Sequence, residues 1–202
     1  MNKLFLSLLV LGSLTYAKSG CILVQSNKVD VTWKAFKTPK KIGVGGKFTQ
    51  VDYTSPAKEG KNFRALLVGA TVDIDTNSVN SGNAPRDAKL VKFFFSQLDN
   101  MHITGKITDI EADAHTKGSP YTGKLTVMID MNRKSVPTQM HYRYAEGKFE
   151  AHGSIDLAKF AALDALSGLT KACYELHKGK TWADVEIGFT TDIEATQCQV
   201  EK

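Results

Sequence analysis

The residues able to do acid–base, metal or nucleophilic chemistry are spread along the whole 202-residue chain. It contains no Gly-x-Ser-x-Gly, His-Glu-x-x-His, phosphate-loop or Cys-x-x-Cys motif, each of which fixes a reactive group in a defined local geometry. Asp73 and Asp75 fall on one face of an expected strand, where two carboxylates could act as acid and base. A solvated strand face explains them more simply, so we expect neither an enzyme nor a cofactor.

The histidines offer one candidate for metal binding. The sequence contains His102, His115, His141, His152 and His177. A two-residue hairpin turn at positions 146–147 would place His141 opposite His152 on neighbouring strands. Two imidazoles alone do not make a tight Zn²⁺ site, which normally has a third or fourth protein ligand. We therefore interpret this pair as exposed neighbours and expect no metal.

The N-terminal residues have the layout of a signal peptide. One lysine precedes an apolar run from Leu4 to Leu14, and small residues follow at Thr15 and Ala17. This run is too short to span a bilayer. We expect cleavage after Ala17 (residues 1–17 removed), export to the periplasm, and one domain over residues 18–202. A lipid anchor on Cys21 is disfavoured, because Lys18 stands where such a site needs an aliphatic residue.

The charge of the expected mature chain is mildly basic. The formal net charge is +5, and it falls to +4 when the one lysine of residues 1–17 is removed. Lys37, Lys40 and Lys41 form a local cluster, but no aromatic residues interleave with it as they would in a nucleic-acid platform. We expect no nucleic-acid partner. A solvated loop is the simpler reading of the cluster, and a phosphate or membrane contact is the alternative.

Three cysteines in an exported chain allow one disulfide and leave one thiol. Cys21 lies near the start of the first expected strand and Cys198 near the end of the last. If these strands are neighbours in a barrel, the two cysteines meet, and we favour this pairing. Cys173 falls on the apolar stripe of a helix and suits a buried thiol. Pairing of Cys173 with either of the others is the alternative.

The elements that must position these residues are mostly strands. Apolar residues alternate over positions 29–35, 66–74, 101–107, 125–131 and 185–193, and this period of two marks strands with one face on a core or cavity. The hairpin at 146–147 adds two more strands. One helix is expected at residues 159–178, with Asp156 as a candidate cap. About eight strands and one late helix favour an up-and-down barrel or a sandwich.

Several segments resemble the YceI-like, polyisoprenoid-binding family of exported lipid carriers. They are VDVTWKAFK, KIGVGGKFTQVDY, VDIDTNSVNSGNAPRDAKLVKFFF, YTGKLTVMIDMN and ADVEIGFTTDIEA. The third carries the pattern of Ile74, Ser78, Gly82, Arg86, Asp87, Leu90, Phe94 and Phe95. One position departs from the family, because Lys89 precedes Leu90 where a histidine is common. The resemblance covers nearly all of the mature chain.

The resemblance implies an all-β fold, an eight-stranded antiparallel lipocalin-like barrel with one helix before the last strand. Its function would be to hold and carry a long-chain amphiphile, such as a polyisoprenoid, an isoprenoid quinone or a fatty amide, in an apolar channel. A homodimer and a transient contact with the membrane surface are compatible with this function. The alternative is an exported stress or envelope protein that binds no lipid and acts through its surface.

The residues expected to form the channel are apolar and mostly point inward from strands. They are Trp33, Phe48, Leu66, Val68, Val72, Phe94, Phe95, Ile103, Leu125, Val127, Ile129, Met140, Tyr142, Phe149, Leu163, Leu166, Ile187 and Phe189. Among them Phe94, Phe95, Leu163 and Leu166 would plug or gate one end. Candidates for binding a polar head group are Arg86, Asn132, Tyr142 and Tyr144.

Overall fold

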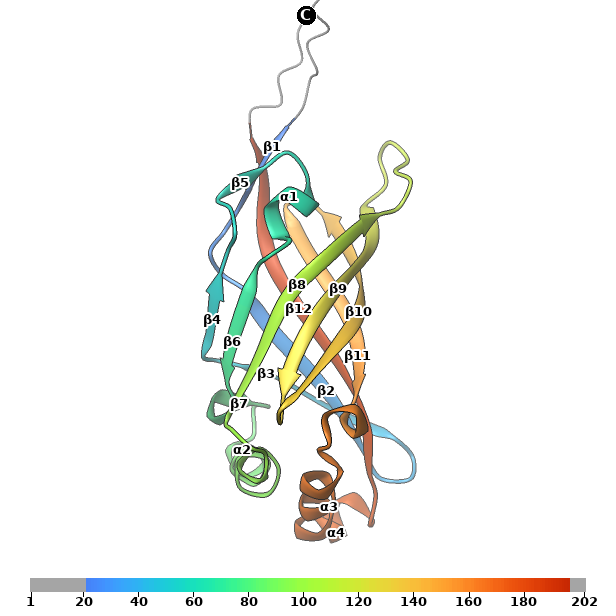
Figure 1. Ribbon diagram of the computed structural model, residues 1–202. Coiled ribbons are helices and arrows are strands. Elements are labelled where there is room, and N and C mark those ends of the chain that lie inside the picture. Colours follow the sequence, from blue (N-terminus) through green and yellow to red (C-terminus); the bar gives the residue numbers. More distant parts are fainter. Residues whose placement is uncertain (1–20, 197–202) are drawn as a thin grey trace, which may run out of the picture.

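The computed structural model describes residues 21–196, and these form one curled antiparallel sheet with helices at its ends (Figure 1). The strands are β1 (Ile22–Gln25), β2 (Asp30–Lys37), β3 (Ile42–Phe48), β4 (Val51–Thr54), β5 (Glu59–Gly60), β6 (Thr71–Asp75), β7 (Val79–Asn80), β8 (His102–Ala112), β9 (Tyr121–Met131), β10 (Lys134–Ala145), β11 (Lys148–Asp156) and β12 (Thr181–Thr196). The all-β prediction is confirmed.

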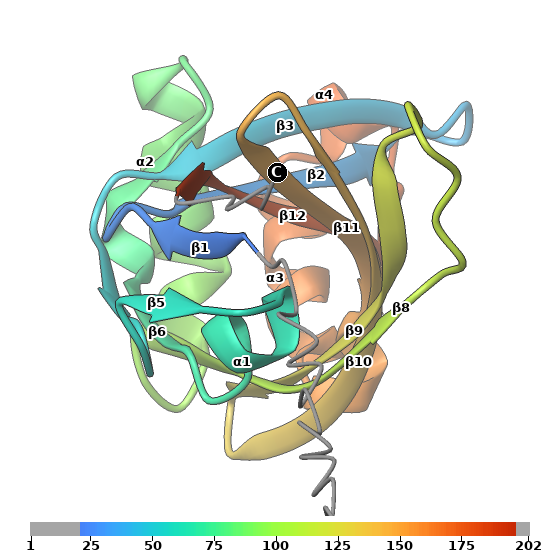
Figure 2. The ribbon, with the colours of Figure 1, turned by 90° about the horizontal axis from the view of Figure 1, so that it is seen from above.

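The sheet bends round so that its two ends are joined by the chain. The main path of neighbours runs β4-β6-β8-β9-β10-β11-β12-β2-β3-β7, and β1 pairs with β12 and β5. Only Thr49 and Gln50 separate β3, which lies next to the β7 end of this path, from β4 at the other end. The result is the ring seen from above in Figure 2. The predicted number of eight strands is wrong. The sheet contains three additional short strands, β1, β5 and β7, and two non-strand residues separate β3 from β4.

Alternation along the strands places the apolar residues inside, as predicted. In β9, Leu125, Val127, Ile129 and Met131 are buried, whereas Lys124 and Asp130 are exposed. The β10–β11 hairpin also forms in the predicted register, with Tyr144 opposite Phe149 and His141 opposite His152. Its turn residues Glu146 and Gly147 both have positive φ, at 52° and 78°, which suits a two-residue turn between twisted strands.

The predicted strand over 66–74 is wrong in its first half. Residues Phe63–Leu67 form the short helix α1, and β6 begins only at Thr71. The Asn62 side chain accepts a hydrogen bond from the Ala65 backbone N–H (2.8 Å), which caps the helix. Leu66 is fully buried on this helix. Alternation over so few residues did not distinguish one helical turn from a strand.

The predicted helix over 159–178 is broken into three pieces. They are the 3₁₀ turn η3 (Leu157–Phe160), α3 (Leu163–Ala172) and α4 (Tyr174–His177). Asp156 does cap the first piece, by accepting a hydrogen bond from the Ala158 N–H (2.9 Å). Ala161 then has φ 53°, which ends the turn and redirects the chain into α3.

A second helix packs beside α3 and was not predicted. It is α2 (Ala84–Phe93), capped by the Asn83 side chain and with Pro85 in its first turn. Two 3₁₀ turns, η1 (Thr76–Ser78) and η2 (Phe95–Gln97), flank it. In Figure 1, α2, α3 and α4 lie together at one end of the barrel and α1 lies at the other. The structure therefore has a helical end and an α1 end.

Candidate ligand-binding site

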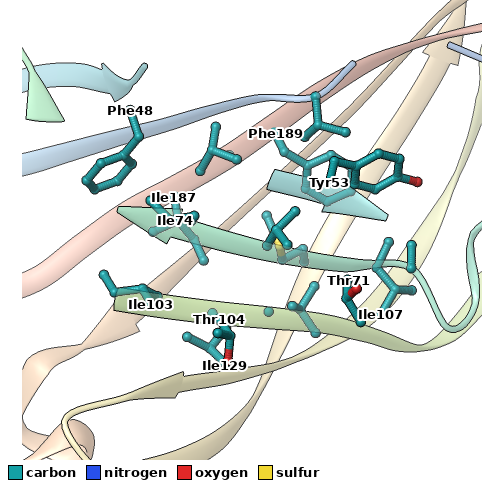
Figure 3. Close-up of a pocket in the computed structure, with 18 of the residues that line it drawn as sticks. Phe48, Tyr53, Thr71, Ile74, Ile103, Thr104, Ile107, Ile129, Ile187 and Phe189 are labelled. Atoms are coloured by element: carbon teal, nitrogen blue, oxygen red, sulfur yellow. The ribbon is translucent and has the colours of Figure 1, made fainter. Parts of the chain in front are cut away.

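An apolar cavity lies inside the curled sheet (Figure 3). It encloses about 920 Å³ of space between side chains, including its open mouth. Its wall is made mostly of aliphatic and aromatic side chains from facing strands, among them Phe48, Ile74, Ile103, Ile129, Ile187 and Phe189.

Gln25 and Tyr53, two polar side chains of this cavity, bond to one another and to Thr191. Gln25 donates from its amide nitrogen to the Thr191 hydroxyl (3.2 Å), and its amide oxygen accepts a hydrogen bond from the Tyr53 hydroxyl (2.8 Å). The Thr191 hydroxyl in turn donates to the carbonyl of Lys28 (2.9 Å). Burial raises the pKa of Tyr53, so its hydroxyl stays protonated at neutral pH. Because the network is internally satisfied, this part of the cavity suits an apolar chain.

A second apolar cavity continues the first beneath the helices. It encloses about 680 Å³ and shares Trp33, Phe48 and Ile187 with the main cavity. Phe94 and Phe95 contribute to its wall, and the Phe95 ring lies edge-on to Phe48 with 6.1 Å between ring centroids. The two cavities are therefore adjacent apolar spaces, one in the barrel interior and one toward the helical end.

A third cavity opens from the second between β2, α2 and α4. It encloses about 910 Å³, including open solvent, and shares Ala35, Leu90 and Leu169 with the second cavity. Its outer wall differs from the other two because it carries cationic and titratable side chains. These are Lys37, Arg86, Lys89 and His177.

An aromatic cluster fills the barrel at the α1 end. The ring of Phe63 lies 4.9 Å from Tyr144, 5.3 Å from Phe149 and 5.8 Å from Tyr142, measured between centroids. The Tyr144 hydroxyl donates to the Ile193 carbonyl (2.9 Å), and burial raises the pKa of both Tyr142 and Tyr144. The Tyr142 hydroxyl is buried without a hydrogen-bond partner among the described residues. The cluster packs this end with side chains.

Twelve of the predicted channel residues line the first or second cavity. They are Trp33, Phe48, Val72, Phe94, Phe95, Ile103, Val127, Ile129, Met140, Leu166, Ile187 and Phe189. The other six do not line these cavities. Leu66, Leu125, Tyr142 and Phe149 are packed into the core, Val68 ends α1, and Leu163 is 48% exposed on α3. Their positions follow from the helices that were not expected and from the filled α1 end.

The head-group candidates are mostly engaged by the protein itself. Asn132 donates from its amide nitrogen to the carbonyls of Phe160 (3.0 Å) and Ala161 (3.1 Å), so it fixes the turn before α3. Arg86 donates from Nε to the Ser81 hydroxyl (2.8 Å) and from Nη2 to the Ser81 carbonyl (3.1 Å). Of the candidates, Arg86 alone lines one of the three cavities, namely the third.

Sequence reasoning missed Lys89 and His177 as candidate site residues, and it treated Lys37 only as part of a lysine cluster. Arg86 and Lys89 are three residues apart, a spacing that puts both on one face of a helix. That signal was not used, because no helix was expected at 84–93. His177 lines the same cavity from α4, which follows the break after α3.

The other chemical candidates form separate structural contacts. Asp73 binds the ring of His102 (2.7 Å), while the Asp75 side chain accepts from the Asn77 N–H (2.8 Å) and caps η1. Their hydrogen bonds therefore go to different partners. Over residues 21–196, no group of three or more His, Cys, Asp or Glu residues is placed to hold a metal ion. Within the same range, no helix is long and apolar enough to cross a membrane.

The cysteine prediction is resolved in part. Cys173 is free and buried, so the alternative pairings through Cys173 are wrong. The start of β1 does lie beside the end of β12, since Ile22 pairs with Thr196. Cys198 lies outside the described residues, as does the expected signal peptide at 1–17. The Cys21–Cys198 bridge and the cleavage after Ala17 stay predictions.

A curled antiparallel sheet around adjacent apolar cavities defines the class of lipocalin-like β-barrels. Within that class, the YceI-like domain model matches residues 23–195, so the chain belongs to the YceI-like family. A search of curated proteins gave no match.

Solved structures share the fold at low sequence identity. A polyisoprenoid-binding domain from Saccharophagus degradans is 13% identical, with a TM-score of 0.55 over 87% of this chain and 99% of that one. BcnA from Burkholderia cenocepacia is 16% identical, with a TM-score of 0.52 over 82% and 96%. A YceI protein from Campylobacter jejuni is 18% identical, with a TM-score of 0.52 over 76% and 85%.

Proposed function

We propose that this protein binds a long-chain amphiphile in its barrel and carries it through the periplasm after export. The candidate cargoes are a polyisoprenoid, an isoprenoid quinone and a fatty amide. The observation that carries this proposal is the pair of adjacent apolar cavities, together called the passage, which share Trp33, Phe48 and Ile187. The S. degradans domain of the same fold, described as polyisoprenoid-binding, supports the choice of a lipid.

The energetics of burial favour such a ligand. Moving about 500 Å² of apolar chain out of water gains roughly 12 kcal/mol gross, at about 25 cal/mol per Å². Association and ordering costs reduce this sharply. Carrying a lipid needs no catalytic group, which agrees with the separate structural contacts of Asp73 and Asp75. A transient contact with the membrane surface would serve loading and release, and a homodimer is compatible with the same role.

Native mass spectrometry of the protein purified from the periplasm, followed by organic extraction, tests the binding. A co-purified isoprenoid, quinone or fatty amide at about one per chain is the expected result. A clean apo mass, with no binding when such lipids are added, would favour the alternative function. In that alternative the protein is an exported stress or envelope protein that binds no lipid and acts through its surface.

A pair of tryptophan substitutions in β9 ties the bound lipid to the cavity. Val127 points into the main cavity, whereas its neighbour Thr126 lies on the other face of the strand. Val127→Trp should fill the passage and remove the co-purified lipid, while Thr126→Trp should retain it. Equal lipid content in both variants would place the lipid elsewhere.

The proposed location has its own test. Cell fractionation should recover the protein in the periplasm, and its intact mass should correspond to residues 18–202. Recovery of an uncleaved chain in the cytoplasm would contradict export.

A further inference from the structure

We propose that the third cavity is the mouth of the lipid passage and that it binds an anionic head group, a phosphate or carboxylate, at Lys37, Arg86, Lys89 and His177. This inference rests on the proposed function and narrows its ligand class from amphiphiles in general to anionic ones. It also assigns an orientation, with the head group at the helical end and the tail in the barrel.

The three cavities adjoin one another in the order that this orientation needs. Trp33 lines all three. The second and third cavities share Trp33, Ala35, Leu90 and Leu169, and Thr181 is the one polar residue common to both. An apolar tail entering between α2 and α4 therefore meets a mostly apolar wall on its way to the main cavity.

Within residues 21–196, no acidic side chain forms an ion pair with the cations at the mouth. Among the described residues that line this cavity there is no aspartate or glutamate. The ion pairs formed within residues 21–196 use other cations, namely Lys34, Lys41, Arg64, His102 and Arg133. Lys37, Arg86, Lys89 and His177 are all half-buried. Half-buried like charges repel one another in a medium less polar than water, and a bound anion would relieve this repulsion.

The four side chains come from three elements, and the charges of Lys37 and Lys89 act on His177. Burial and the positive charges of Lys37 and Lys89 lower the pKa of His177, which shows that β2, α2 and α4 bring these groups close together. The His177 Nδ1 lies 2.7 Å from the Thr181 hydroxyl, and this contact orients the ring. The cluster is therefore a product of the tertiary fold.

Arg86 is held in a fixed orientation at the mouth. Its Nε and Nη2 donate to Ser81, and Ser81 is fixed in turn by Asp87, which accepts from the Ser81 N–H (3.0 Å). Within the described residues, Nη1 donates no hydrogen bond to the protein. A guanidinium that is already positioned binds phosphate or carboxylate with little loss of side-chain entropy.

The far end of the passage is a poor place for a charged head group. The polar residues there, Gln25, Tyr53 and Thr191, are bonded to one another and carry no charge. Placing an anion beside them would bury it without a counter-charge, which is costly. Both ends of the passage therefore favour the same orientation.

Matched probes test the head-group preference by isothermal titration calorimetry of the delipidated protein. The probes are geranylgeraniol and geranylgeranyl monophosphate, which share one tail, and inorganic phosphate, which has none. We expect the prenyl phosphate to bind at least about tenfold more tightly than the alcohol, since charge-assisted hydrogen bonds are stronger than neutral ones. Raised salt should reduce this difference.

The double variant Lys37→Gln/Lys89→Gln should lose the preference for phosphate while retaining its affinity for the alcohol. The matched control is Lys40→Gln/Lys171→Gln, which removes two exposed lysines that do not line the cavity. It should leave both affinities unchanged. Retained alcohol binding also shows that the first variant is folded.

The outcomes separate the two proposals. Equal binding of the alcohol and the phosphate would overturn the anionic head-group site and leave the lipid-binding proposal standing. Inorganic phosphate that binds as tightly as the prenyl phosphate would mean a site for a free anion, and it would also overturn the inference. Binding of neither prenyl probe would overturn this inference and the prenyl cargoes of the proposed function.

Discussion

The indole of Trp33 lies directly against the backbone of Gly46 on the neighbouring strand. A Cβ at position 46 would come within 2.7 Å of the Trp33 Cζ2 and within 2.5 Å of the Asn80 carbonyl oxygen. Because Gly46 has no side chain, the indole of Trp33 can lie against it. Trp33 is the residue that lines all three cavities. The adjacent Gly45 is less restricted, since its Cβ would lie 3.3 Å from the nearest atom, the Trp33 carbonyl oxygen.

Substitution of Gly46 should therefore disturb both stability and the passage. Gly46→Ala forces the indole or the β7 backbone to move, and we expect a loss of about 1–3 kcal/mol in the free energy of unfolding. Gly45→Ala is the matched control and should cost distinctly less. Urea unfolding measures the stability, and the tryptophan emission wavelength reports the displaced ring. Equal losses in the two variants would show that the contact with Trp33 is not the cause.

The α1 end should depend on Phe63. Removing this ring takes away its edge contacts with Tyr144 and Phe149. We expect Phe63→Ala to lower the free energy of unfolding by about 3 kcal/mol, the usual size for truncating a packed aromatic residue. Leu163→Ala, at a residue that is 48% exposed, should change it by less than about 0.5 kcal/mol. A small effect at Phe63 would mean that the aromatic cluster does not stabilise this end of the barrel.

Two histidines should give pH dependences of opposite sign. Burial, Lys37 and Lys89 lower the pKa of His177 below 6.5 in the folded protein, so the unfolded chain takes up its proton first on acidification. Its contribution to stability is present above about pH 6.5 and is lost as the pH falls through the folded value. The hydrogen bond and charge of Asp73, aided by Asp75 and Asp52, raise the pKa of His102. Its contribution is complete below about pH 6.5 and is lost as the pH rises.

Thermal unfolding between pH 5 and 8 separates the two effects. His177→Gln should flatten the fall in Tm on the acid side, and His102→Gln should flatten the smaller fall on the alkaline side. The effect at His102 is small because that pair is exposed to solvent. Unchanged slopes in His177→Gln would show that the cations at the mouth do not act on this ring.

Thiol counting checks the predicted Cys21–Cys198 bridge. After denaturation without reductant the chain should show one reactive thiol, contributed by Cys173, and Cys173→Ala should show none. Cys21→Ser should lower the free energy of unfolding by about 2–5 kcal/mol, because the bridge closes nearly the whole chain into a loop. Three reactive thiols in the unsubstituted protein would contradict the bridge.

Local sequence determined the strands and their register. Alternation fixed which face of β9 is buried, because a shift of one residue would expose Leu125, Val127 and Ile129. The turn at positions 146–147 fixed the pairing of Tyr144 with Phe149 for the same reason. These features depend on neighbours along the chain or across one tight turn, so they could be read from the residues themselves.

The tertiary structure decided how the helices close the barrel and what they bring together. Periodicity over five residues did not reveal α1, whose burial comes from packing on the barrel. The lysines at 37 and 89 are 52 positions apart and meet only because β2 and α2 border one cavity. Whether that passage is open or filled depends on the packing of side chains from strands far apart in sequence. Such packing is a property of the assembled fold, which alternation within one strand does not encode.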